Sequence, residues 1–229
     1  TYLNMKNGVT DALTTFYVTN NSLTCIEVNA EDIDYATENW TYENGNIDEG
    51  VGFSVVCAPE GYTYVPDDNF EQALIDLGYD DTLDDFVLIE NISGVTSLNV
   101  NERQISDLTG IEDFASLTTL FCRSNQLTSL DVSSNTALVS LYCYYNFLTS
   151  LDMSSNTALI DLDCNWNRLT SLDVSANTAL ISLICHNNQL TSLDVSSNTA
   201  LTDLHCSTNQ LTYLNMKNGV TDALTTFYV

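Results

Sequence analysis

Leucine and cysteine recur along the C-terminal part of this 229-residue chain with a strict period of 21 residues. From Leu117 onward each block begins L-x-x-L-x-C-x-x-N-x-L, so apolar and polar positions alternate around the cysteine. Alternation with a period of two is typical of a half-buried strand. In the block that opens at Leu138 we expect six side chains to point inward, namely Leu138, Leu141, Cys143, Leu148, Leu151 and Met153.

Five such blocks follow one another, and a degenerate 22-residue block, VTSLNVNERQISDLTGIEDFAS, precedes them. The pattern is the leucine-rich-repeat signature with cysteine at the third inward position. It predicts an α/β-type repeat solenoid dominated by β-structure, with right-handed rungs and one parallel sheet. The second half of each rung is too short for a long helix, so we expect extended or 3₁₀ structure there. The asparagine at the ninth place of each block is expected to stack and to satisfy backbone groups at the turn.

The segments that precede the rungs have the marks of caps. PDDNFEQALIDLG, residues 66–78, predicts a helix that begins at Asp67 or Asp68 and stops at Gly78. Residues 25–57 are interpreted as a closing cap, in which VGFSVVC predicts a strand. We therefore divide the chain into a last rung with a C-terminal cap (1–57), a linker with a helical N-terminal cap (58–94), and rungs (95–229).

The first eighteen residues, TYLNMKNGVTDALTTFYV, return without a substitution as residues 212–229. Both copies fit the rung template, and residue 1 falls in the middle of a rung. The offset of 211 residues therefore predicts a larger period, so that the chain is one unit of a tandem array.

The seven cysteines divide into two groups. Five share one inward position and should form a buried, reduced ladder: Cys122, Cys143, Cys164, Cys185 and Cys206. Their regular spacing does not match a zinc site, which needs close pairs. Cys25 and Cys57 lie outside the ladder and are the disulfide candidates, which implies an oxidising, extracellular setting.

Charge excludes several functions. The net charge is −26, with five basic residues, so no basic stripe exists to bind nucleic acid or an anionic membrane surface. No apolar stretch is long enough to insert into a bilayer. The two histidines, His186 and His205, should face outward, and no catalytic motif accompanies them. We expect a protein that is not an enzyme and has no obligatory cofactor.

Acidic positions leave two interpretations open. Asp131, Asp152, Asp173 and Asp194 recur in register, and each could cap its own turn or bind a cation between rungs. The run DDTLDD could supply oxygen ligands for Ca²⁺ from Asp80, Asp81, Asp84 and Asp85, although it is not an EF-hand loop. The alternative is that these carboxylates are simply solvated.

Several phrases resemble secreted leucine-rich-repeat proteins of Bacteroidetes-type bacteria. They are YVPDDNFEQALIDLGYDDTLDDFV (64–87), NISGVTSLNV (91–100), ISDLTGIEDF (105–114), LTSLDVSSNTAL (127–138) and LTCIEV (23–28). The 21-residue cysteine rung also resembles the repeats of internalin-like adhesins. The resemblance implies secretion, a bacterial cell-surface location, and attachment or interaction in place of catalysis. It also implies a possible O-glycosylation acceptor at Thr82.

Aromatic residues gather around the cysteine positions of three consecutive rungs: Phe121, Tyr142, Tyr144, Tyr145, Phe147 and Trp166. Strand positions that flank an inward cysteine should point outward. These residues could anchor a glycan or a protein, or they could pack on each other and stiffen the sheet. Two functions follow from the sequence. One is a structural module of a long extracellular fibre that associates with neighbouring copies, and the alternative is a glycan- or protein-binding surface adhesin.

Overall fold

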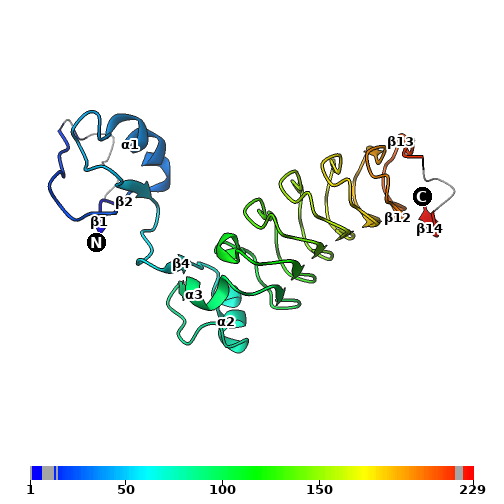
Figure 1. Cartoon of the computed structure of the whole chain (residues 1–229), viewed down its shortest axis with the longest axis horizontal. Helices are drawn as coiled ribbons and strands as arrows, with labels where there is room; N and C mark the ends of the chain where they lie inside the picture. The colour runs from blue at the N-terminus through cyan, green and yellow to red at the C-terminus, as the bar shows by residue number, and fades with distance from the viewer. Residues whose placement is uncertain (1, 7–12, 14, 220–223) are drawn as a thin grey trace. The chain divides into compact units, whose positions relative to one another are not determined.

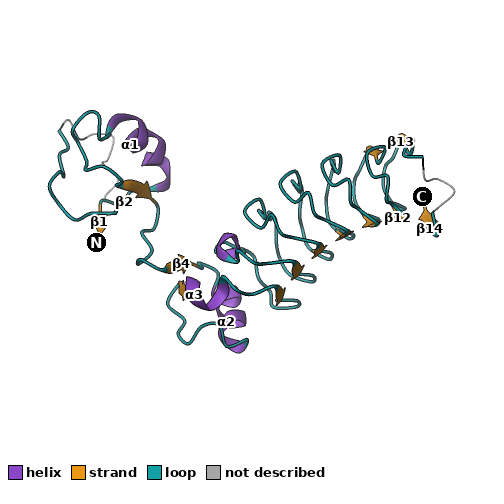
Figure 2. Ribbon diagram, viewed as in Figure 1, coloured by secondary structure: helices purple, strands orange, loops and turns teal. Residues whose placement is uncertain are grey.

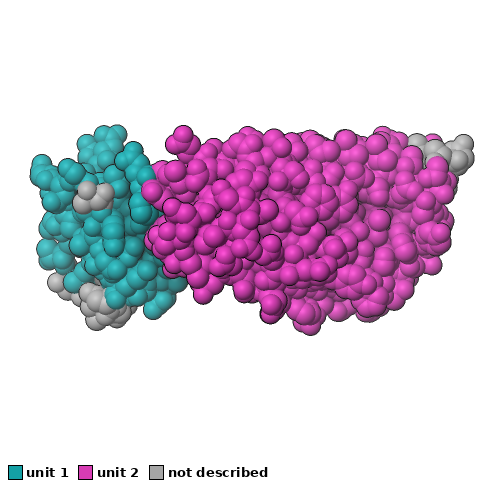
Figure 3. All heavy atoms as spheres, turned by 90° about the horizontal axis from the view of Figure 1, so that it is seen from below, with its two compact units in different colours: residues 1–60 teal, residues 61–229 magenta. Residues whose placement is uncertain are grey.

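The structure is a computed structural model that describes residues 2–6, 13, 15–219 and 224–229. The chain forms two compact units, residues 1–60 and 61–229, which are coloured separately in Figure 3. Parts of the duplicated segment, 1, 7–12, 14 and 220–223, lie outside the described residues. The division at 57/58 and 94/95 remains a prediction. It concerns where each repeat unit begins and ends, whereas the boundary after residue 60 separates two compact units.

Unit 2 contains the predicted solenoid, whose rungs follow one another along the chain in Figures 1 and 2. Its main sheet has seven parallel strands, one in each rung. The strands are β6 (Ser97–Asn99), β7 (Thr119–Phe121), β8 (Ser140–Tyr142), β9 (Asp161–Asp163), β10 (Ser182–Ile184), β12 (Asp203–His205) and β14 (Thr226–Tyr228). A second pair, β11 (Ser192–Asp194) and β13 (Tyr213–Asn215), is also parallel. The leucine-rich-repeat fold expected from the sequence is confirmed.

The core is a stack of identical positions. From β6 to β12, the central leucine of each strand pairs in register with the central leucine of the next, for example Leu141 with Leu162, and Leu204 of β12 pairs with Phe227 of β14. All six inward positions expected in the second block are buried, and Leu138, Cys143 and Met153 are fully buried. Burying each aliphatic side chain contributes about 1.5–3 kcal/mol, so the repeat stabilises itself by adding the same contacts at every rung.

The ninth-position asparagines connect consecutive rungs, as predicted. Asn146 donates its amide to the carbonyls of Cys122 and Cys143, each at 3.0 Å, and its Oδ1 accepts from the Leu127 N–H at 3.1 Å. Asn167 repeats this pattern one rung later. The ladder satisfies buried backbone groups at a turn where the strand has ended.

A second asparagine ladder was not predicted from the sequence. Its members, Asn135, Asn156, Asn177 and Asn198, have no exposed surface. The amide of Asn156 donates to the carbonyls of Val132 and Asn135, each at 3.0 Å. The motif S-S/A-N-T-A carried the signal, because an invariant polar residue between apolar positions has to be paired when it is buried.

The aspartate ladder caps its own turns. The Ser133 N–H donates to Asp131 at 2.9 Å, and the same bond recurs at Asp152, Asp173 and Asp194. Hydrogen bonds from the backbone and the side chain of the serine two residues later hold the pKa of each aspartate below its usual value. Of the two interpretations, turn capping accounts for the recurrence.

An N-terminal cap precedes the first rung. Helix α2 (Asp68–Asp76) begins after Asp67, whose carboxylate accepts from the N–H groups of Asn69 and Phe70, and Gly78 follows with φ +80°. The cap also contains an antiparallel pair, β4 (Tyr62–Tyr64) with β5 (Phe86–Leu88), and one helical turn, α3 (Ile89–Ile92). A 3₁₀ turn, η3 (Ile111–Asp113), lies in the first rung. The helix was predicted, but the strand pair was not, because residues 58–65 lack a run of alternating apolar residues.

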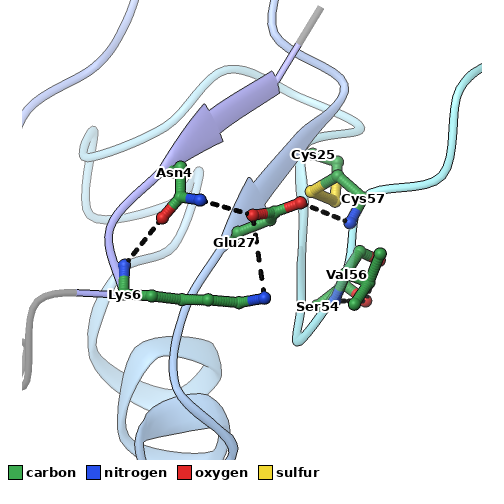
Figure 4. The surroundings of a disulfide bond; sticks show 7 residues. All are labelled: Asn4, Lys6, Cys25, Glu27, Ser54, Val56 and Cys57. Atoms are coloured by element: carbon green, nitrogen blue, oxygen red, sulfur yellow. Dashed lines mark hydrogen bonds and ion pairs between the residues drawn. A yellow bond between two sulfur atoms is a disulfide. The ribbon is translucent and has the colours of Figure 1, made fainter. Parts of the chain in front are cut away.

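Unit 1 is a small three-stranded sheet with one helix. Parallel strands β1 (Tyr2–Asn4), β2 (Cys25–Glu27) and β3 (Gly52–Ser54) follow in that order, and η2 (Ala30–Asp32) leads into α1 (Ile33–Asn39). The expected strand in VGFSVVC is β3, whereas α1 was not predicted. Its core includes Phe16, Ile26 and Trp40, all buried. A disulfide joins Cys25 to Cys57 beside Glu27, as Figure 4 shows.

Candidate functional site

The sheet of unit 2 presents two outward columns of side chains, because the first and third residues of each strand face away from the core. The third-position column consists of Asn99, Phe121, Tyr142, Asp163, Ile184, His205 and Tyr228. The first-position column contains only serine, threonine and aspartate. The side chains that differ between rungs therefore concentrate in the third-position column and in the turn that follows it.

The predicted aromatic residues form one surface over three rungs, which we call the aromatic surface (Phe121, Tyr142, Tyr144, Tyr145, Phe147 and Trp166). Phe121 and Tyr142 stack at 4.9 Å between ring centroids with an interplanar angle of 4°. Tyr145 stacks on Trp166 at 5.3 Å and also contacts Tyr144. Tyr145, Phe147 and Trp166 remain 49, 41 and 46% exposed. Packing between rungs thus accounts for part of the surface and leaves three large rings open to solvent.

The expectation that these residues lie on the strands is only partly right. Phe121 and Tyr142 are strand residues, but each strand ends before its cysteine. Tyr145 and Trp166 occupy a left-handed turn, with φ of 54° and 49°. The same conformation recurs at this place in every rung from Ser124 onward, because the chain must turn sharply after the cysteine. The aromatic surface therefore extends from the sheet over its edge.

Two arginines lie against the aromatic surface. The guanidinium carbon of Arg123 lies 5.6 Å from the centre of the Tyr144 ring, and that of Arg168 lies 4.7 Å from the centre of the Phe147 ring. A cation over an aromatic face is attracted by the ring's quadrupole. Since the chain has five lysines and arginines in all, this surface combines aromatic rings with an uncommon amount of positive charge.

Asp163 is a polar feature of this surface that sequence reasoning missed. It follows Tyr142 in the third-position column, and its carboxylate accepts hydrogen bonds from the backbone and side chain of Asn165. Burial raises the pKa of Asp163 to about 6, although the Asn165 hydrogen bonds oppose this change. The signal in the sequence was a single carboxylate at a position that is aromatic in the two preceding rungs.

The histidines face outward on later rungs, as expected, and they touch each other. The rings of His186 and His205 are 4.0 Å apart, and His205 also contacts Tyr228. Burial, and then the neighbouring His205, lower the pKa of His186. This pair continues the ring contacts along the sheet beyond the aromatic surface.

The calcium candidates do not converge on a metal site. Among the described residues, no group of three or more histidine, cysteine, aspartate or glutamate side chains is placed so that it could hold a metal ion. Asp84 accepts from the Phe86 N–H, while Asp81 accepts from the hydroxyl of the exposed Thr82 at 2.9 Å. Asp80, Asp81, Asp84 and Asp85 as calcium ligands, and Thr82 as a glycosylation site, stay predictions.

The same loop covers a buried carboxylate that the sequence did not reveal. Glu71 of α2 has no exposed surface and accepts from the Asp84 N–H at 2.9 Å. Within the described part of the chain, its Oε2 and the Oδ2 of Asp80 have no hydrogen-bond partner. Burial raises the pKa of both Glu71 and Asp80, and their mutual proximity to Asp84 adds to the effect.

The two groups of cysteines are placed differently. Cys25 and Cys57 are bonded, with their Cα atoms 5.8 Å apart, and Glu27 accepts from the Cys57 N–H (Figure 4). The five ladder cysteines are free thiols and buried. Burial raises the pKa of Cys122 to about 12, and that of Cys143 and Cys185 well above the usual value. Such thiols are neutral at physiological pH, and they act as small apolar side chains.

Known proteins share this geometry. A scan against models of protein families finds no match. Internalin J of Listeria monocytogenes serotype 4b (strain F2365) is 43% identical over 76 residues, which are 32% of this chain and 8% of that protein. The solved functional domain of InlJ from Listeria monocytogenes, described as including a cysteine ladder, has a TM-score of 0.67 and 37% identity over 76% of this chain and 39% of that one. An internalin (inlF) from the same species has a TM-score of 0.59 and 25% identity over 65% of this chain and 45% of that one.

The chain thus spans less than a tenth of the curated relative and less than half of either solved domain. The description of the InlJ domain as including a cysteine ladder agrees with the buried thiols of this chain. The chain is thus a leucine-rich-repeat protein with a buried cysteine ladder, and in these two features it is similar to the internalins.

Proposed function

We propose that the chain is a structural repeat module of a long extracellular fibre or stalk, in which leucine-rich-repeat units follow one another on one polypeptide at a bacterial surface. The observation that carries the proposal is the duplicated segment. As residues 212–229 it continues the rungs of unit 2 through β13 and β14, and as residues 1–18 it supplies β1 beside the cap strand β2. The same eighteen residues therefore continue the solenoid in unit 2 and precede the cap in unit 1.

Two features, the disulfide and the net charge, support this role. The disulfide suits an oxidising compartment outside the cytoplasm. The net charge of −26 favours solubility outside the cell. In the part of the chain that the structure describes, no helix has the length and apolar character needed to cross a membrane. We further propose a secreted protein of Bacteroidetes-type bacteria with a non-enzymatic role.

The size of the native protein tests the array. If units repeat every 211 residues, the intact chain isolated from its source is several times heavier than one module. Peptide mapping then finds the TYLNMKNGVTDALTTFYV segment about once for every 211 residues of that chain. A native chain with a mass near 25.3 kDa contradicts the proposal.

A second candidate function is adhesion, and the aromatic surface favours it. Tyr145, Phe147 and Trp166 expose large rings beside the paired polar groups of Asp163 and Asn165. Exposed tyrosine and tryptophan can stack on sugar rings or insert into a protein partner, and they contribute a large share of binding energy where they do so. The partner is a glycan or a surface protein.

A triple variant tests this function. Replacing Tyr145, Phe147 and Trp166, the three exposed rings, by Ser leaves the leucine and cysteine core intact and is expected to abolish binding in glycan arrays and surface-protein screens. The matched control replaces Tyr17, Tyr42 and Tyr62 by Ser, since all three are exposed outside the aromatic surface. Binding that persists in the folded triple variant, or that is lost equally in the control, removes the adhesion assignment.

A further inference from the structure

The turn that follows each ladder cysteine differs in charge from the rest of the chain. Its side chains occupy the first, second and fourth places after the cysteine, and none of them is an aspartate or a glutamate in any of the five blocks. The whole chain has 31 acidic residues against five lysines and arginines, yet two of those five, Arg123 and Arg168, lie in this turn. The turn therefore forms a strip without negative charge on a strongly acidic protein.

Arg168 is exposed beside the open rings of the aromatic surface. Its guanidinium carbon lies 4.7 Å from the centre of the Phe147 ring, and Trp166 precedes it in the same turn. Within the part of the chain that the structure describes, Arg168 takes part in no ion pair. A guanidinium group has five N–H donors, and stacking on a ring leaves the donors at its edge free. Arg168 thus has donors available for an anion from outside the chain.

Arg123 is paired, but the pair is weak. Its Nη1 lies 2.9 Å from Oε1 of Glu102, and the two side chains are 35 and 61% exposed. An ion pair between exposed side chains contributes little stability, because water solvates both charges. The guanidinium carbon of Arg123 also lies 5.6 Å from the centre of the Tyr144 ring, in the next rung. A carboxylate that binds Arg123 through two N–H groups can therefore displace Glu102 at small cost.

The same rungs offer flat apolar surface and neutral polar groups. Tyr145 stacks on Trp166 with an interplanar angle of 19°, and both rings remain about half exposed. Such rings can pack against the C–H face of a sugar ring. The equivalent positions in the rungs on either side are Ser124 and Asn187, which have the same left-handed backbone. A hydroxyl and an amide next to the rings can bond to sugar hydroxyl groups.

We propose that this turn surface, consisting of Arg123, Tyr145, Phe147, Trp166 and Arg168, binds an acidic glycan, a saccharide whose rings carry carboxylate groups. Sugar rings lie on the exposed aromatic rings, and carboxylates accept paired N–H groups from the two arginines. Charge selects this class of ligand, because an anionic saccharide is repelled by the acidic remainder of the chain and attracted only where carboxylates are absent and guanidinium groups are free. The inference rests on the adhesive function proposed above and names its ligand.

Calorimetric titration of the full chain tests the class of ligand. The probes are a galacturonate hexamer and sialyllactose, and each is compared with its methyl ester, which keeps the same rings without the negative charge. At about 0.05 M salt, where screening is weak, we expect at least one acidic probe to bind about tenfold or more tightly than its ester. A uridylate decamer, which carries phosphates in place of carboxylates, is expected not to bind.

Single variants test the two arginines. Arg168→Gln and Arg123→Gln should each weaken binding of the acidic probe about tenfold or more and leave binding of its ester unchanged. Glu102→Gln should tighten it severalfold, because it frees Arg123 from a competing carboxylate. Lys217→Gln is the matched control, since it removes one exposed positive charge outside the turn surface. Thermal denaturation shows that each variant is folded.

Selective binding of an acidic probe that falls in both arginine variants and persists in the control supports the proposal. The proposal is overturned if neither acidic probe binds, if the esters bind equally well, if folded arginine variants retain full affinity, or if the uridylate decamer binds more tightly. Failure here is distinguishable from failure of adhesion, because adhesion stands if the aromatic triple variant loses glycan or protein binding that the arginine variants keep. The mass of the native polypeptide tests the fibre independently of both.

Discussion

Asn146 offers the sharpest test of how the rungs hold together. Its side chain is 4% exposed and pairs three buried backbone groups, the Leu127 N–H and the carbonyls of Cys122 and Cys143. Replacing Asn146 by Ala leaves these groups without that partner. The two carbonyls keep a second donor, the amides of Asn125 and Asn167, so only the Leu127 N–H is left unpaired, at a cost of about 1–3 kcal/mol. With the two lost carbonyl bonds at about 0.5–1.5 kcal/mol each, the free energy of unfolding of unit 2 should fall by roughly 2–6 kcal/mol. That is a large part of the stability of a typical domain.

Urea denaturation followed by tryptophan fluorescence measures this loss. The chain has two tryptophans, one in each unit, so a Trp40→Phe background leaves Trp166 as the reporter of unit 2. Asn91→Ala is the matched control. Asn91 is exposed and donates one hydrogen bond to the Tyr79 carbonyl at 3.0 Å, and its removal should cost no more than about 1 kcal/mol. Equal losses in the two variants would refute the ladder as a source of stability.

Three further predictions follow from the cysteines and from Asp163. The five ladder thiols should react with a thiol reagent only after denaturation, because burial keeps them neutral and inaccessible; rapid native labelling would contradict the core assignment. Replacing Cys25 and Cys57 by Ser should destabilise unit 1 by about 3–4 kcal/mol through loop-closure entropy, and Trp40 fluorescence should report the loss while Trp166 does not. Because the pKa of Asp163 is raised to about 6 when folded, the folded state holds its proton more tightly than the unfolded state, and stability should fall as the pH rises from about 4 to 6. Asp163→Asn should remove that fall and stabilise unit 2 at neutral pH, which thermal denaturation across this pH range would show.

The repeat itself was determined by the sequence. A period of 21 residues places Leu141 beside Leu162 and Cys143 beside Cys164, because equal spacing brings equal positions together in a parallel stack. The N-cap at Asp67 was equally readable, since a helix start depends on the few residues around it. Features with a local or periodic cause could therefore be predicted.

The tertiary structure decided features that depend on what surrounds a residue. Glu71 is on a helix whose pattern does not distinguish a buried carboxylate from an exposed one, and only the loop around Asp84 covers it. Helix α1 and the β4–β5 pair also escaped prediction, because their short segments are stabilised by contacts with distant parts of the same unit.

The aromatic surface lies between these cases. The sequence located all six rings within three rungs, but the left-handed turn at Tyr145 and Trp166 moved two of them from the sheet to its edge. Phe16 and Phe227 make the same point more directly, since identical sequences leave one ring buried and the other half exposed. Sequence determines which groups a rung carries, whereas burial is a property of the neighbour that covers them, and only the folded arrangement supplies that neighbour.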